Sequence, residues 1–155
     1  MASLEELNLE TLDFGEISAE EFARLVKNTG KRELAAAVAG PVRARVLDEV
    51  FGRMRDRFKP DAAGRLSAVV RWRIVDDGEP DAVYTMVIGD GTCAVAKGAD
   101  EREPRLTLTM AAVEFLRLAS GNASGTTMFM TRRLKAGGDL SLAAVLTRYF
   151  DIPRG

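Results

Sequence analysis

The sequence predicts an α+β domain, in which helices cover one face of a five-stranded, mostly antiparallel sheet and a helical extension precedes it. Apolar residues recur at helical spacing before residue 60 and after residue 110, but they alternate with period two between residues 66 and 110. The chain has 155 residues, 46% of them apolar, which is enough to bury the core of one domain. Helices, then hairpin-linked strands, then helices again indicate an α+β arrangement.

The N-terminal part is expected to form an arm followed by two helices. Residues 1–17 are acidic with scattered leucines, and we interpret them as an arm that docks through these apolar side chains. Ser18 and Glu21 have the spacing of a capping box, so a helix is predicted to begin there and to end near Gly30. A shorter helix is predicted over residues 32–38.

Residues 41–58 form the clearest amphipathic helix, with Pro41 in its first turn. Arginines and acids, Arg43 among them, are expected on the solvated side. The helix packs either into the core or against a membrane surface, and the interleaved acids favour the core.

Five strands are predicted where the period is two or where a basic segment lies between turns. Trp72 is expected on the buried face of the first strand, and Gly89-Asp90-Gly91 is expected to form a tight hairpin turn. The strands are expected over residues 66–75, 82–88, 92–97, 105–110 and 133–137.

The remaining helices are predicted around the segment from Phe115 to Asp139, which combines glycine-rich turns with an apolar cluster at Met128–Met130. One helix is expected over residues 110–120 and a short one over residues 123–130. A final helix over residues 140–150 would be capped by Asp139.

Composition argues against several classes of function. The net charge is -1, so nucleic acid is not expected as a partner. Histidine is absent and Cys93 is the single cysteine, so no disulfide, metal site or other cofactor is predicted. The chain has no apolar run of about 20 residues, as a transmembrane segment would need. Its start does not resemble a signal peptide, and a cytoplasmic location is expected.

Local motifs allow two interpretations each. The glycine turns lack the spacing of nucleotide-binding loops, and the acid pairs Asp76-Asp77 and Asp100-Glu101 are expected in solvated turns. Arg132 and Arg133, with Lys135, could hold an anionic headgroup or could protect an edge strand from pairing. The methionine and aromatic residues fill either a core or a cavity, and composition favours the core.

The C-terminal two thirds resembles the sterol carrier protein type-two family of lipid-binding domains. The resemblance lies in the ordered series Leu106–Met110, Glu114–Gly121, Met128–Met130, Leu134–Asp139 and Leu140–Phe150. The order and spacing of these segments match the family pattern, in which a threonine-alternating strand, two helices, a lysine-containing strand and a last helix follow one another. The chain resembles an actinobacterial-like member of this family in which the domain stands alone and is not fused to another protein domain.

The resemblance covers residues 41–152 and implies two parts, an extension over residues 1–40 and a sterol-carrier-like domain over residues 41–155. The family implies an apolar tunnel between sheet and helices that binds a fatty acid, fatty acyl-CoA, phospholipid or sterol-like molecule without catalysis. The lining that it implies is Val70, Trp72, Ile74, Met86, Leu106, Leu108, Phe115, Met128, Phe129, Met130, Leu142, Leu146 and Phe150.

Under this hypothesis Arg132 and Arg133 would contact the headgroup. The partners expected are a lipid or another apolar small molecule, and transiently a membrane surface or an enzyme. Two alternatives stay open: an accessory subunit of a biosynthetic complex that docks through the arm, and an enzyme that encloses an apolar substrate.

Overall fold

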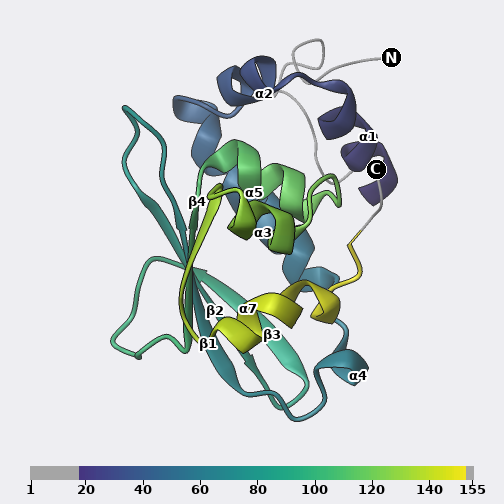
Figure 1. Cartoon of the computed structure of the whole chain (residues 1–155), viewed down its shortest axis with the longest axis vertical. Helices are drawn as coiled ribbons and strands as arrows, with labels where there is room; N and C mark the ends of the chain where they lie inside the picture. The colour runs from purple at the N-terminus through teal and green to yellow at the C-terminus, as the bar shows by residue number, and fades with distance from the viewer. Residues whose placement is uncertain (1–17, 153–155) are drawn as a thin grey trace.

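The computed structural model describes residues 18–152, so the predicted arm over residues 1–17 lies outside the described residues. A five-stranded sheet in the order β3-β2-β1-β4-β5 forms one layer, and the helices pack against one of its faces (Figure 1). The strands are β1 (Ala68–Ile74), β2 (Ala82–Gly89), β3 (Thr92–Lys97), β4 (Leu106–Met110) and β5 (Leu134–Gly138). The predicted α+β class and the five strands are confirmed.

The sheet is mixed, with one parallel pair at its centre. β1 pairs antiparallel with β2 and parallel with β4, and Trp72 lies opposite Tyr84 on one side and Leu108 on the other. The outer pairs, β2 with β3 and β4 with β5, are antiparallel. Because three of the four pairings are antiparallel, the expectation of a mostly antiparallel sheet is confirmed.

The predicted hairpin turn joins β2 to β3. Asp90 and Gly91 have φ values of 52° and 73°, so both central residues are left-handed, as a two-residue hairpin of matching twist requires. The Asp-Gly pair is suited to this turn because aspartate tolerates the left-handed region and glycine has no Cβ to clash.

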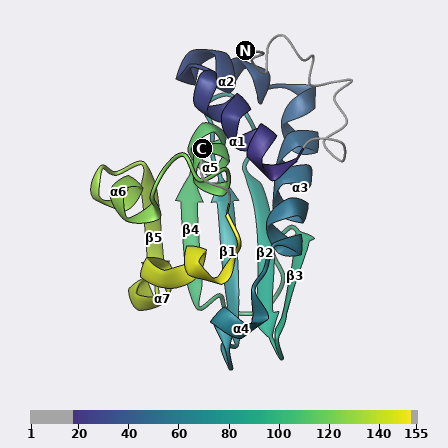
Figure 2. The same cartoon turned by 90° about the vertical axis from the view of Figure 1, so that its right-hand side faces the viewer.

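The helices occupy one side of the sheet and both of its ends (Figure 2). The helix α4 was not predicted, and it begins at Pro60, where a proline suits the first turn. The helices are α1 (Ala19–Asn28), α2 (Lys31–Ala37), α3 (Pro41–Asp56), α4 (Pro60–Ala63), α5 (Ala112–Ala119), α6 (Gly125–Met130) and α7 (Leu140–Val145).

The two N-terminal helices share the core of the sheet domain. The side chain of Ser18 accepts a hydrogen bond from Glu21 N at 3.1 Å, which confirms the predicted cap of α1. Val26 and Leu34 are buried in the same apolar cluster as the sheet residues. Asn122, in the turn that follows α5, donates a hydrogen bond to Ala23 O at 2.9 Å and connects this turn to α1.

Aromatic rings fill the space between α3, α5 and the centre of the sheet. The ring of Phe51 stacks on those of Tyr84 and Phe115, with centroid distances of 4.1 and 4.2 Å. Its edge contact with Trp72 has a centroid distance of 5.6 Å. Such offset and edge-to-face pairs add to the stabilisation from apolar burial. The layer between helices and sheet is therefore densely packed at this point.

Arg43 corrects one prediction, because it is buried rather than solvated. Its guanidinium donates hydrogen bonds to Asp76 Oδ2, to Ile74 O at 3.0 Å and to Pro80 O at 2.9 Å. Asp76 also accepts from the backbone N–H of Ala112, the first residue of α5. Asp76 was expected to be solvated, but it links α3, the β1–β2 turn and α5. Helical periodicity could not indicate this partner, which lies 33 residues away.

The final helix is shorter than predicted. After Val145 the chain tightens into a 3-10 turn at Leu146–Tyr149 and then becomes extended. Phe150 pairs with Phe58 as an isolated β-bridge, and Lys59 N donates to Tyr149 O at 2.7 Å. An α-helix cannot make this pairing, because the bridge needs the extended backbone that Phe150 adopts, with φ -128° and ψ 142°. The bridge therefore ends the helix early.

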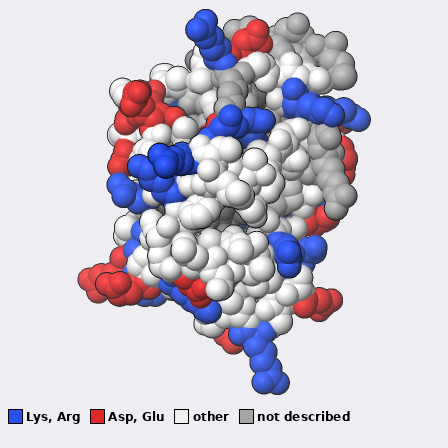
Figure 3. Space-filling view, viewed as in Figure 1, with Lys and Arg blue, Asp and Glu red and all other residues white. Residues whose placement is uncertain are grey.

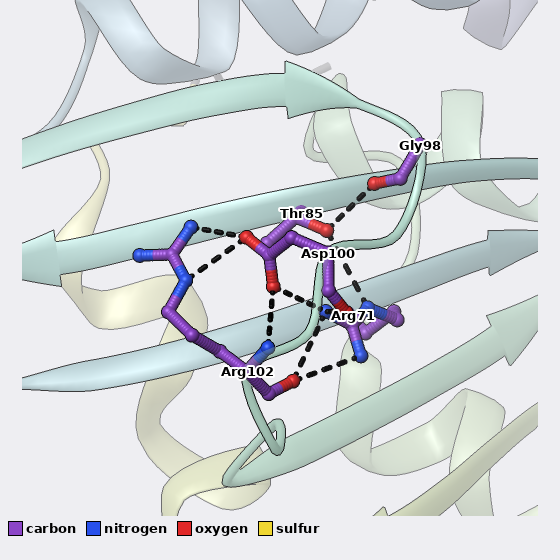
Figure 4. A network of polar contacts seen from close by, with 5 residues as sticks. All are labelled: Arg71, Thr85, Gly98, Asp100 and Arg102. Carbon is purple, nitrogen blue, oxygen red and sulfur yellow. Dashed lines mark hydrogen bonds and ion pairs between the residues drawn. The ribbon is translucent and has the colours of Figure 1, made fainter.

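Among residues 18–152, no helix covers the opposite face of the sheet, and this face holds a polar network (Figure 4). Arg71, on β1, donates to Asp100 Oδ1 at 3.0 Å and to the carbonyl of Arg102. Thr85 accepts from Arg71 and donates to Gly98 O at 2.7 Å. Asp100 was expected in a solvated turn, and here it fastens the β3–β4 loop to the sheet.

Candidate functional site

Two cavities form one groove between α6 and α7. The larger has a volume of about 630 Å³ and the smaller about 150 Å³. Four small or short side chains line both of them: Gly125, Thr126, Ala143 and Ala144. We call this continuous depression the α6–α7 groove.

Helix caps fix the positions of the two helices that border the groove. Ser124 accepts from Thr127 N at 3.4 Å and begins α6, and Asp139 accepts from Leu142 N at 3.1 Å and begins α7. The predicted cap at Asp139 is thus confirmed. Asp139 also accepts from Arg105 Nε at 2.9 Å, which fastens the start of α7 to the start of β4.

The charge state of Asp139 supports this arrangement. The backbone hydrogen bond from Leu142, and after it the hydrogen bond from Arg105, hold the pKa of the Asp139 carboxyl below its ordinary value. Both interactions favour the ionised form. The cap is therefore charged at neutral pH, and a negative charge at a helix N-terminus is stabilising.

The smaller cavity is the apolar end of the groove. Six of its eight lining residues are apolar: Phe129, Leu134, Ala136, Leu140, Ala143 and Ala144. Phe129 and Leu140 are exposed over 48% and 52% of their surface, so they form a lip where the cavity meets solvent. Leu134 is buried and closes the base.

The larger cavity is the polar end. Lys59, Asn122, Ser124, Thr147 and Asp151 contribute polar side chains to its wall. Asp151 is already paired with Arg57, at 3.5 Å between Oδ2 and Nη1. Within residues 18–152, Lys59 forms no ion pair. Its ammonium group is thus available to an anion in the cavity.

The thirteen expected lining residues fall into three groups. Phe129 lines the apolar end of the groove and Phe150 lines the polar end. Met130 is 76% exposed and lines neither cavity. The other ten are buried in the core with Phe150: Val70, Trp72, Ile74, Met86, Leu106, Leu108, Phe115, Met128, Leu142 and Leu146. The tunnel that these ten would line stays a prediction.

Arg132 and Arg133 are both exposed and follow Thr131, the C-cap residue of α6. Arg133 N donates to Met128 O at 2.8 Å and Arg132 N donates to Phe129 O at 3.2 Å, which is the hydrogen-bond pattern of a Schellman motif. Arg132 has φ 63° and occupies the left-handed position of this motif, where glycine is the usual residue. Neither arginine lines the groove, and their contact with a headgroup stays a prediction.

A further cavity of about 440 Å³ lies between α1, α2 and the end of α5. Its wall includes Val26, Leu34, Lys27, Arg117 and Asn122. Asn122 borders both this cavity and the polar end of the groove. In the wall of this cavity, the side chains of Thr29 and Asn122 donate hydrogen bonds to backbone carbonyls within the protein.

The described residues offer few of the groups that enzymes commonly use for metal or nucleophilic catalysis. No group of three or more histidine, cysteine, aspartate or glutamate residues that could hold a metal ion occurs in residues 18–152. Burial raises the pKa of the Cys93 thiol to about 11, so its nucleophilic thiolate is scarce at neutral pH.

No helix in the described part of the chain is both long and apolar enough for a membrane span.

The groove-lining residues Gly125, Ala143 and Ala144 were not identified from the sequence. Small side chains leave space only where their neighbours are held apart, and that depends on tertiary placement. The glycine-rich turn before α6 was the one usable signal, since it separates α5 from α6 and borders the larger cavity at Gly121 and Ser124.

Comparison with known proteins gives a family and a fold. The model of the SCP-2 sterol transfer family matches residues 47–151. Sterol Carrier Protein 2 Like 2 from Aedes aegypti superposes with a TM-score of 0.56 at 16% identity, over 68% of this chain and 96% of that one. Sterol Carrier Protein-2 from Aedes aegypti, solved in complex with palmitate, superposes with a TM-score of 0.53 at 20% identity, over 66% of this chain and 91% of that one.

An enzyme shares the same fold over part of its length. The stereoselective inverting sec-alkylsulfatase Pisa1 from Pseudomonas sp. superposes with a TM-score of 0.57 at 16% identity, over 70% of this chain. The chain spans only 16% of that enzyme. At these identities the structural similarities show the fold alone.

Proposed function

Because the chain belongs to the SCP-2 sterol transfer family, we propose that it binds a lipid-like molecule in the α6–α7 groove and presents or transfers it. One observation carries the proposal: an apolar cavity and a polar cavity share a wall, so that the groove is amphipathic along its length. Ligand pockets typically combine apolar lining with a few polar groups that fix orientation.

The chemistry of the two ends suggests how a ligand lies. An acyl chain would enter the apolar end beside Phe129 and Leu140, and the head would face Lys59 at the polar end. A carboxylate or phosphate suits the ammonium group of Lys59. The ligand classes proposed are a fatty acid, a fatty acyl-CoA, a phospholipid or a sterol-like molecule, and the lysine favours the anionic ones. The Aedes aegypti relative solved with palmitate supports a fatty acid.

The proposed role is non-catalytic and cytoplasmic. The chain contains no histidine, which is the commonest general base near neutral pH, and the wall of the groove includes one carboxylate, at Asp151. Asp151 is paired with Arg57. A single cysteine agrees with a reducing compartment.

The test is a groove-filling variant. Ala144 lines both cavities, so Ala144→Phe should place a ring between the two ends and weaken palmitate binding at least ten-fold. Native mass spectrometry and displacement of a fluorescent fatty acid measure the affinity. Ala35→Phe, at an exposed alanine on α2 that lines none of these cavities, is the matched control and should bind like wild type.

Two results would contradict the proposal. The first is a wild-type protein that takes up no fatty acid, acyl-CoA, phospholipid or sterol. The second is equal palmitate affinity for Ala144→Phe and wild type, which would place the ligand elsewhere, for example in the predicted tunnel between sheet and helices.

A further inference from the structure

We propose that the surface formed by Phe129, Met130, Leu140, Arg132 and Arg133 docks onto an anionic lipid bilayer, and that the groove exchanges its ligand there. We call it the α6–β5 surface. Its purpose rests on the proposed function, but the docking itself can be tested without any ligand. The bilayer is the occupant that its combination of apolar and cationic side chains favours.

The apolar side chains of this surface are exceptional within the molecule. Among residues 18–152, the large apolar side chains that are exposed are Phe129, Met130 and Leu140, at 48%, 76% and 52%. All three lie on α6 or at the first position of α7. Contiguous exposed apolar residues commonly mark an interaction site. Figure 3 shows an uncharged surface across the middle of this face, with both basic and acidic side chains around its borders.

Positive charge adjoins these apolar residues without a nearby acid to balance it. Arg132, Arg133 and Lys135 are exposed, and none of them forms an ion pair within the described part of the chain. No acidic residue occurs between Glu114 and Asp139. Asp139 itself is engaged by Arg105 and by Leu142 N. The local charge is therefore positive although the net charge of the chain is -1.

Backbone geometry places the cations directly beside the apolar residues. The Schellman motif at the end of α6 reverses the chain at Arg132, so Arg132 and Arg133 lie two and three residues after Met130, with the cap residue Thr131 between. Met128 is 1% exposed and anchors α6 to the core, so Phe129 and Met130 are held on the outer side. Apolar side chains that enter the interface, together with basic residues that meet anionic headgroups, are the two components of peripheral membrane binding.

The position of the groove explains why docking would serve exchange. Phe129 and Leu140 belong both to the α6–β5 surface and to the lip of the apolar cavity. A bilayer in contact with this surface would therefore cover the apolar end of the groove. An acyl chain could pass between membrane and groove with little exposure to water.

The experiment is co-sedimentation of the ligand-free full chain with sucrose-loaded vesicles. Phosphatidylcholine vesicles containing 30% phosphatidylglycerol are compared with pure phosphatidylcholine, at roughly 50 mM and 500 mM salt. We expect at least ten-fold stronger partitioning onto the anionic vesicles at low salt and loss of that difference at high salt. Met130→Gln and Arg133→Glu should each weaken it several-fold. Arg65→Glu, at an exposed arginine between α4 and β1, changes the net charge equally and should have little effect.

Three outcomes would overturn the inference: equal partitioning onto neutral and anionic vesicles, equal losses for Arg133→Glu and Arg65→Glu, or a dimer in solution that Met130→Gln dissociates. The last would show that a second copy of the chain occupies this surface. Ala144→Phe separates the two proposals, because it should lose palmitate but still sediment with anionic vesicles. Loss of palmitate binding in the groove and loss of vesicle binding by the surface are therefore measured separately.

Discussion

Arg132 adopts a left-handed backbone conformation that a glycine occupies at the equivalent position of α5. α5 and α6 end in the same hydrogen-bonded motif, and the left-handed position holds Gly121 with φ 78° in one and Arg132 with φ 63° in the other. An L-residue there is strained by roughly 1–2 kcal/mol, which exceeds the entropic cost of a glycine.

Arg132→Gly should therefore raise the free energy of unfolding by about 0.5–1 kcal/mol. Urea denaturation measures the change. Gly121→Ala, at the equivalent residue of α5, should act in the opposite direction and lower stability by about 1 kcal/mol. A destabilised Arg132→Gly protein would mean that the Arg132 side chain makes a stabilising contact that outweighs the strain.

At the scale of elements, the buried ion pair of Arg43 and Asp76 holds three segments together. The two side chains are 6% and 25% exposed, and the pair joins α3 to the β1–β2 turn and to the start of α5. Removal of one partner leaves the other charge poorly solvated, which is more damaging than loss of a surface pair.

Asp76→Ala should lower the free energy of unfolding by about 2–3 kcal/mol, since the pair is only partly shielded from water. Asp81→Ala is the comparison, because Arg73 and Asp81 are 46% and 50% exposed and such pairs contribute below about 1 kcal/mol. Thermal and urea unfolding of both variants measure the difference. Equal effects would show that the Arg43 network is not a principal link between these elements.

At the scale of the whole molecule, acid should weaken the fold through its engaged carboxylates. Hydrogen bonds donated by Leu142 N and Arg105 lower the pKa of Asp139, and hydrogen bonds donated by Arg102 do the same for Asp100. A carboxyl whose folded pKa is depressed stabilises the fold above its ordinary pKa of 3.8, and this contribution is lost as the pH falls through the lower, folded value.

Stability should therefore decline steeply as the pH falls below about 4, and Asp139→Asn should make the decline shallower than in wild type. Urea titrations at several pH values between about 6 and 2 provide the measurement. Asp61→Asn, which removes an exposed carboxylate from α4, serves as control. If Asp139→Asn and wild type have the same pH dependence, the cap is not ionised in the way that its hydrogen bonds indicate.

Periodicity and turn chemistry made most of the architecture predictable. Alternation around Trp72 and the Asp90-Gly91 turn are local signals, and the strands and the hairpin follow from them. The early end of α7 and the burial of Arg43 depend on partners far along the chain, at Phe58 and Asp76. The groove was missed for the same reason, because its walls are small residues whose spacing only tertiary packing defines.

The β-bridge between Phe58 and Phe150 has a consequence for the order of folding. It joins residues about ninety positions apart, and a loop of that length costs entropy before its contacts are made. Lys59 and Phe150, which both line the polar end of the groove, come together only when this bridge forms. We therefore expect the groove to be completed late, after the local hairpin and helices. During refolding, we expect the capacity to bind a ligand to appear after most of the secondary structure.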